Sequence, residues 1–152
     1  MENNCNRSKK IQAWLLVLVW MAVIFSFSAQ NAARSSASSG TLAALLARLL
    51  GQQNAGFIEI LLRKGAHFAE YALLGGLCLR AFWRTLPARP RRCAALAWAL
   101  SALYAAGDEL HQLFVPGRSG QLRDVLLDSA GALCGILLLA AGLRQRARRG
   151  SR

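Results

Sequence analysis

Acidic residues and paired cysteines are scarce in this sequence. Seven aspartates and glutamates stand against nineteen lysines and arginines in 152 residues, which gives a formal net charge of +12. A soluble protein with this charge would be a candidate nucleic-acid binder, but no nucleic-acid-binding motif accompanies the basic residues. The four cysteines form no CxxC pair and the chain holds no HExxH sequence, so neither a disulfide framework nor a zinc site is predicted.

Long apolar runs are plentiful instead. Apolar residues make up 55% of the chain and form four blocks, over about residues 11–27, 65–83, 93–113 and 125–143. Each block approaches the roughly 20 residues that cross about 30 Å of hydrocarbon. The first block has no charge and so lacks the polar stripe of a soluble bundle helix, and its length favours an uncleaved anchor over a signal peptide. The sequence predicts one all-α membrane domain over residues 1–152, with four transmembrane helices.

The charges divide between the two sets of predicted helix ends. Thirteen cations lie before the first block, between the second and third, and after the fourth: Arg7, Lys9, Lys10, Arg80, Arg84, Arg89, Arg91, Arg92, Arg144, Arg146, Arg148, Arg149 and Arg152. All acids except Glu2 lie toward the opposite ends: Glu59, Glu70, Asp108, Glu109, Asp124 and Asp128. The positive-inside rule predicts that both termini are cytoplasmic, with the basic C-terminal tail on anionic lipid headgroups. Because charge near a bilayer is costly, function is expected on the outer, acidic face.

A short amphipathic segment lies between the first two blocks. Residues 41–50 place their leucines on one helical face and are followed by Gly51. This stretch is too short to span a bilayer, so it is expected to form an interfacial helix. Asn54 is expected to begin a further helix that runs through residues 57–62 into the second block, and residues 114–121 are expected to form a turn.

Polar residues interrupt the second block along one face. Lys64, His67, Glu70 and Tyr71 follow one another at i, i+3, i+6 and i+7, so they share one side of a helix. A single charge at a helix end is usually a solvated or snorkelling side chain. His67 and Glu70, however, lie within the apolar run, where an isolated charge costs several kcal/mol. This set therefore predicts a shared polar site.

The third and fourth blocks carry polar residues at the matching ends. Asp108, Glu109 and Gln112 lie together at the outer end of the third block, and Asp124 and Asp128 are one turn apart at the start of the fourth. A helix N-terminus favours negative charge, which suits both of these aspartates. The three outer ends are therefore expected to contribute to one cluster.

Small residues predict how two of the helices pack. Gly131 and Gly135 lie four residues apart in the fourth block, and Gly75 and Gly76 lie in the second. Glycines at this spacing let helix backbones approach closely within a membrane. The second and fourth helices are therefore expected to touch.

Two stretches resemble a known family. RKGAHFAEYALLG, at residues 63–75, and DELHQLFVPGRSGQLRDVLLDSAGALCG, at residues 108–135, resemble the VanZ-like family of small membrane proteins, and FSFSAQ after the first block also fits it. The family pattern falls on Lys64, His67, Glu70, Tyr71, Asp108, Glu109, Gln112, Pro116, Arg118, Asp124, Asp128, Gly131 and Gly135. The resemblance implies a bacterial inner-membrane protein of the cell envelope, linked to glycopeptide (teicoplanin) resistance, without implying a reaction. Asn often stands at the position of Asp128 in the family, which argues against an essential carboxylate there.

One interpretation of the outer cluster is an enzyme that hydrolyses or transfers a phosphoester of a lipid or lipid-linked envelope molecule. His67 or Glu109 would be the general base, Arg118 and Lys64 would hold the phosphate, and Gln112 would orient the substrate. The catalytic candidates are His67, Glu70, Asp108 and Glu109. The binding candidates are Lys64, Tyr71, Gln112, Arg118, Asp124 and Asp128.

Other interpretations use the same residues. The four catalytic candidates offer nitrogen and oxygen ligands for zinc or manganese, although no spacing points to a particular metal. A non-enzymatic binder would hold an envelope ligand without turnover. A structural scaffold would use the charges as ion pairs that fix helix register, whereas four spans leave little room for a transporter. The expected partners are membrane lipids and a lipid-linked envelope precursor, with no nucleic acid; no cofactor or oligomeric state is assigned.

Overall fold

The computed structural model describes residues 2–30, 44–49, 51–86 and 89–150. These residues form helices and connecting turns, and none of them lies in a strand. The elements in chain order are α1 (Glu2–Ser28), the short 3-10 helix η1 (Gln52–Asn54), α3 (Ala55–Thr85), α4 (Pro90–Gln112) and α5 (Leu122–Gly150). The predicted all-α fold is confirmed.

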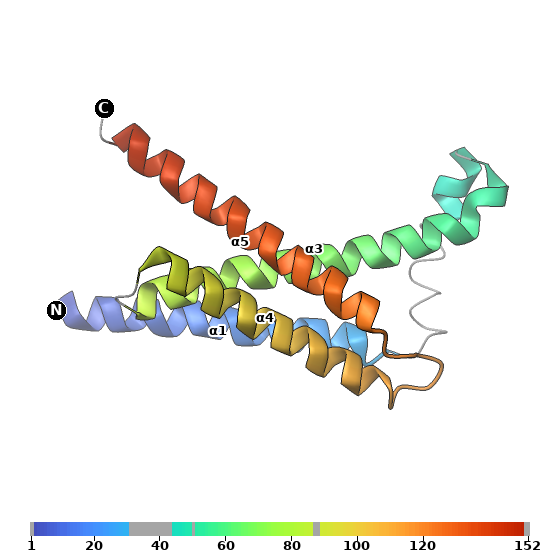
Figure 1. Cartoon of the computed structure of the whole chain (residues 1–152), viewed down its shortest axis with the longest axis horizontal. Helices are drawn as coiled ribbons and strands as arrows, with labels where there is room; N and C mark the ends of the chain where they lie inside the picture. Colours follow the sequence, from blue (N-terminus) through green and yellow to red (C-terminus); the bar gives the residue numbers. More distant parts are fainter. Residues whose placement is uncertain (1, 31–43, 50, 87–88, 151–152) are drawn as a thin grey trace.

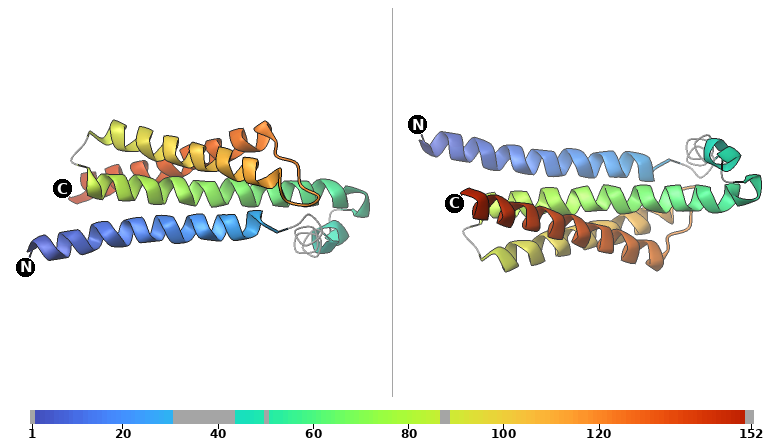
Figure 2. Two further views of the ribbon diagram at one scale, coloured as in Figure 1. Left: turned by 90° about the horizontal axis from the view of Figure 1, so that it is seen from below. Right: turned by 90° about the horizontal axis from the view of Figure 1, so that it is seen from above.

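Helix α3 is the centre of the molecule. It packs against α1 on one side and against α4 and α5 on the other (Figures 1 and 2). Both termini lie at the end of the molecule where α3 passes into α4 (Figure 1). The end of α1, the start of α3 and the loop between α4 and α5 lie at the opposite end, so the helices carry their acidic residues toward one end and most arginines toward the other.

The helices extend beyond the predicted apolar blocks. Helix α3 begins ten residues before the second block, immediately after Asn54 as expected. Within the described chain, Cys5–Ser28 and Leu122–Gly150 are long and apolar enough to cross a membrane. The count of four transmembrane helices stays a prediction, because α3 and α4 do not meet that measure of length and hydropathy.

The predicted interfacial helix is described only in part. Residues 44–49 are helical, whereas residues 41–43 and 50 lie outside the described part of the chain. Ala47 is buried against Ile58 at the start of α3, and the amide of Gly51 donates to the carbonyl of Ala47. Gly51 has φ of 103°, a conformation that favours glycine and ends this helical turn. The segment therefore folds back onto α3.

Glycines set the crossing of α3 and α5, where the two ribbons pass over each other in Figure 1. A methyl group at Gly135 would overlap the carbonyl of Ala72, and one at Gly131 would overlap the carbonyl of Phe68. Gly75 on α3 lies in the same way against the backbone of Ala132. The predicted contact between these two helices is confirmed. It depends on glycine, because a residue with a Cβ atom at these positions would keep the backbones apart.

Aromatic donors attach α1 to the rest of the bundle. The indole of Trp20 donates to the carbonyl of Glu70 at 2.9 Å, and the hydroxyl of Tyr104 donates to the carbonyl of Met21 at 2.7 Å. The outer surface of α1 is apolar and exposed at Leu15, Leu16, Leu18, Val19, Phe25 and Phe27. Exposed apolar side chains along a helix in this way suit contact with lipid.

Candidate functional site

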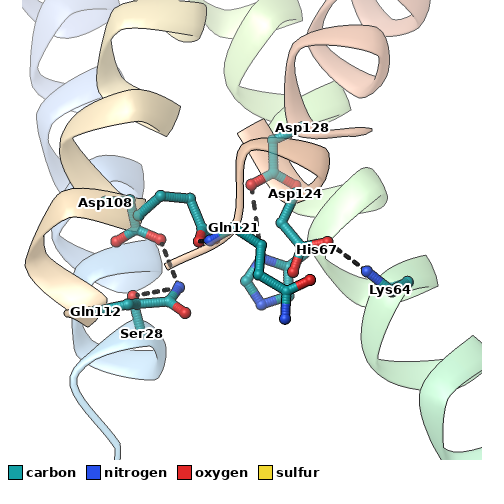
Figure 3. A network of polar contacts seen from close by, with 9 residues as sticks. Ser28, Lys64, His67, Asp108, Gln112, Gln121, Asp124 and Asp128 are labelled. Carbon is teal, nitrogen blue, oxygen red and sulfur yellow. Dashed lines mark hydrogen bonds and ion pairs between the residues drawn. The ribbon is translucent and has the colours of Figure 1, made fainter. Parts of the chain in front are cut away.

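Polar side chains from four helices come close together in the structure (Figure 3). Ser28 comes from α1, Lys64 and His67 from α3, Asp108 and Gln112 from α4, and Asp124 and Asp128 from α5, with Gln121 just before α5. The structure thus brings together part of the predicted set, namely Lys64, His67, Asp108, Gln112, Asp124 and Asp128. Its members form distinct pairs rather than one ring of charges.

The most buried pair joins α3 to α5. His67 Nδ1 lies 3.7 Å from Asp128 Oδ2, and the side chain of Asp128 is 0% exposed. Neither oxygen of Asp128 has a hydrogen-bond partner within the described residues. The pair lies one helical turn from the close contact at Gly131, so the glycine crossing determines how near the imidazole and the carboxyl come.

A second pair lies nearer the surface. Lys64 Nζ and Asp124 Oδ1 form an ion pair between α3 and α5. Asp124 is in the first turn of α5, where the helix dipole stabilises its negative charge. This pair is partly exposed, so solvent reduces its contribution to stability. It closes one side of the site.

The third group ties α1 to α4. Gln112 Nε2 donates to Ser28 Oγ at 3.1 Å and to Asp108 Oδ2 at 3.3 Å, and all three residues are buried. Asp108 Oδ1 has no hydrogen-bond partner among the described residues. The serine was not predicted as a site residue; the polar exit from the first block was the signal that could have indicated it.

Glu109 holds the loop that connects α4 to α5. The amide of Gln121 donates to Glu109 Oε2 at 2.8 Å, and a methyl group at Gly120 would overlap the carbonyl of Glu109. The loop turns at Gly117, which has φ of 77°. Glu109 is only 5% exposed. Its carboxylate therefore acts first as a positioning group for the loop that carries Arg118.

A cavity of about 130 Å³ opens beside these pairs. It is lined by Arg63, Lys64, His67, Gln112, Gly117, Arg118, Ser119, Gln121, Asp124 and Leu127. Five of these were candidate site residues; Arg63, Ser119 and Gln121 were not, although Arg63 directly precedes Lys64. Three cations and one acid line the cavity, so an anion is the ligand that its charge favours.

Arg118 is held in a mixed electrostatic environment. Partial burial lowers the pKa of its guanidinium, and the nearby Arg63 also lowers this pKa. Asp108, Glu109 and Glu70 act in the opposite direction and raise the pKa. An arginine side chain stays protonated in proteins even so. Arg118 therefore supplies a fixed positive charge, with forked donors suited to phosphate or carboxylate.

Several predicted residues lie behind the cavity wall. Glu70, Tyr71, Asp108, Glu109 and Asp128 are not among the residues that line it. Tyr71 is fully buried, with its ring centroid 6.3 Å from that of Tyr104. Within the described residues, no ion pair joins Glu70 to Arg118, and no three His, Cys, Asp or Glu side chains are placed to hold a metal ion.

Similarity to known proteins extends well beyond the two sequence motifs. The model of the VanZ/LLP1 family matches residues 13–143, which include all of the site described above. The chain belongs to the VanZ/LLP1 family. Comparisons with curated proteins and with solved structures find no match. VanZ/LLP1 membership, together with two apolar helices long enough to span, indicates a membrane protein.

Proposed function

We propose that this VanZ/LLP1 protein binds the phosphate group of a lipid or lipid-linked envelope molecule in the cavity beside Arg118. The observation that carries the proposal is the charge of the lining. Three cations line the cavity, Arg63, Lys64 and Arg118, whereas Asp124 is the one acidic residue among the described residues that line it. Lys64 is already paired with Asp124, which leaves two guanidinium groups for a ligand. The cavity volume of about 130 Å³ is well above the roughly 10–15 Å³ that holds one water molecule, so a small group such as phosphate has room there.

The same proposal gives His67 a chemical role. Its Nδ1 faces Asp128 while its ring lines the cavity, so Nε2 is the nitrogen offered to a ligand. In a hydrolysis, His67 accepts a proton as the oxygen of a water molecule bonds to phosphorus. The bond from phosphorus to the lipid oxygen breaks, and that oxygen takes up a proton from solvent water and leaves as an alcohol. Asp128 orients the imidazole and stabilises its charged form.

The topology is part of the proposal. We place four helices across the bacterial inner membrane, with both termini cytoplasmic and the cavity toward the outer leaflet. The distribution of arginine supports this orientation. In a chain whose other cysteines are alanine, Ser119→Cys on intact cells is expected to react with a membrane-impermeant maleimide. Cys5 and Leu86→Cys are expected to react only after permeabilisation. Labelling of Leu86→Cys from outside would contradict the four-span arrangement.

Arg118→Gln is expected to weaken binding of a phosphate-bearing lipid by about tenfold to a hundredfold, the range for a charge-assisted hydrogen bond of about 1.5–3 kcal/mol. The measurement is titration of purified protein in nanodiscs with a synthetic polyprenyl phosphate. Arg123→Gln is the matched control, since Arg123 is exposed, lies at the same end and does not line the cavity. Equal weakening in both variants would show that the cavity is not the binding site.

The mass of the bound molecule separates an enzyme from a non-enzymatic binder. If polyprenyl phosphate binds in an Arg118-dependent manner and its mass is unchanged after long incubation, the protein holds the ligand without turnover. Release of free phosphate supports the hydrolytic role of His67.

A contribution to teicoplanin resistance is the cellular consequence we propose. It predicts that Arg118→Gln, unlike Arg123→Gln, removes any increase in the minimal inhibitory concentration.

A further inference from the structure

A second groove lies at the opposite end of the molecule, between α3 and α5. The two helices diverge beyond their glycine crossing, and α5 leaves the other helices as it approaches the C-terminus (Figure 1). A cavity of about 530 Å³ lies between them. It is lined by Arg80, Trp83 and Arg84 from α3 and by Leu139, Leu143 and Arg146 from α5.

The lining of this groove is partly cationic and partly apolar. Three guanidinium groups are combined with two leucines and a tryptophan, and no acidic residue lines the groove. Arg84 Nη1 donates to the backbone carbonyl of Lys9 at 3.3 Å, and that contact does not neutralise its charge. Close packing of like charges is unfavourable unless an anion lies between them. The groove is therefore complementary to an anionic group that carries an apolar tail.

We propose that this groove binds an anionic phospholipid from the adjacent leaflet. The phosphate would lie between the guanidiniums of Arg80, Arg84 and Arg146, where planar forks match its oxygens. The acyl chain would lie along Leu139 and Leu143. Trp83 is 43% exposed, and its ring suits the level of the headgroups. A free phosphate would leave the apolar half uncovered, so the membrane lipid is the occupant that the lining fits best.

The groove is independent of the polar cavity. The cavity lies at the end of α3 near Lys64, whereas Arg80 and Arg84 lie about four to six turns further along the same helix. The bound lipid would hold together the two helix ends, which diverge on the far side of the crossing at Gly135 (Figure 1). Loss of the lipid would therefore leave phosphate binding beside Arg118 intact.

Native mass spectrometry of the purified full chain tests the proposal. The protein is exchanged into micelles that contain equal amounts of phosphatidylglycerol and phosphatidylcholine. Wild type is expected to retain phosphatidylglycerol at least about tenfold over phosphatidylcholine, because each arginine at a membrane surface attracts anionic lipid. The variant Arg80→Gln/Arg84→Gln/Arg146→Gln is expected to lose this preference. The matched control Arg91→Gln/Arg92→Gln/Arg149→Gln removes the same charge from exposed residues outside the groove and is expected to keep it.

A second measurement locates the acyl chain. Phosphatidylglycerol with brominated acyl chains is expected to quench tryptophan fluorescence in wild type. Trp83→Phe is expected to remove more of that quenching than Trp98→Phe, because both side chains are 43% exposed and only Trp83 lines the groove. Equal loss of preference in the groove variant and the control would overturn the proposal in favour of diffuse surface attraction. Displacement of the lipid by millimolar inorganic phosphate, or a stable dimer that excludes lipid from the groove, would also overturn it.

Discussion

Gly135→Ala is expected to destabilise the protein more than any other single methyl addition in α5. The added carbon would overlap the carbonyl of Ala72 on α3, and backbone has no alternative rotamer with which to move aside. Overpacking of a close contact costs about 1–3 kcal/mol. Helices α3 and α5 are the most extensively packed pair among the described helices, so a change that pushes them apart at the crossing is expected to be costly. The measurement is the midpoint temperature of thermal unfolding in detergent, with unfolding monitored by circular dichroism.

Gly142→Ala is the matched control for this change. It makes the same substitution in the same helix, but a Cβ at Gly142 would meet nothing within 4 Å. Alanine also has a higher helix propensity than glycine, so the control is expected to be neutral or slightly stabilising. Gly131→Ala should also destabilise the protein, but less than Gly135→Ala, because its added carbon overlaps the carbonyl of Phe68 less deeply. Equal midpoints for Gly135→Ala and Gly142→Ala would contradict the close crossing.

The sequence predicts much of the fold because apolar length and charge asymmetry are local properties. The blocks at 11–27 and 125–143 lie inside α1 and α5, and the small residues of α5 indicate which helix it touches. Helix ends are less well predicted, since α3 and α5 continue into polar residues with no loss of backbone hydrogen bonding. The angle at which α3 and α5 diverge depends on packing between distant residues, and no local pattern encodes it.

The sequence indicates five of the residues that line the cavity, but it does not indicate how the charged side chains pair. Helical spacing places Lys64 and His67 on one face, yet it cannot tell which carboxylate on α5 each will meet. The crossing of α3 and α5 determines the pairing, in which Lys64 lies against Asp124 and His67 lies against Asp128. Glu109 differs most from its predicted role as a general base, because its carboxylate accepts a hydrogen bond from the backbone amide of Gln121. That contact depends on the path of a loop, which composition alone does not determine.

His67→Asn is expected to abolish turnover of a phosphate-bearing lipid while leaving its binding nearly unchanged. In the proposed hydrolysis the imidazole on the cavity wall is the general base, and general base catalysis contributes about 10²–10⁴-fold to a rate. Asparagine preserves a polar side chain of similar size but cannot accept the proton. Phosphate release from polyprenyl phosphate in nanodiscs measures the rate, and titration with the same lipid measures affinity. A fall in affinity that matches the fall in rate would place His67 in binding rather than in catalysis.

Asp128→Asn and Glu109→Gln divide the remaining roles. The Asp128→Asn variant would keep a hydrogen-bonding group beside Nδ1 of His67 but would lose the charge that stabilises the imidazolium, so a smaller loss of rate than in His67→Asn is expected. In Glu109→Gln, the new side-chain carbonyl oxygen can still accept the amide of Gln121, so the loop with Arg118 would stay in place. Turnover by this variant is therefore expected to remain near that of wild type. A loss in Glu109→Gln as large as that in His67→Asn would transfer the role of base to Glu109, because only its basicity would have been removed.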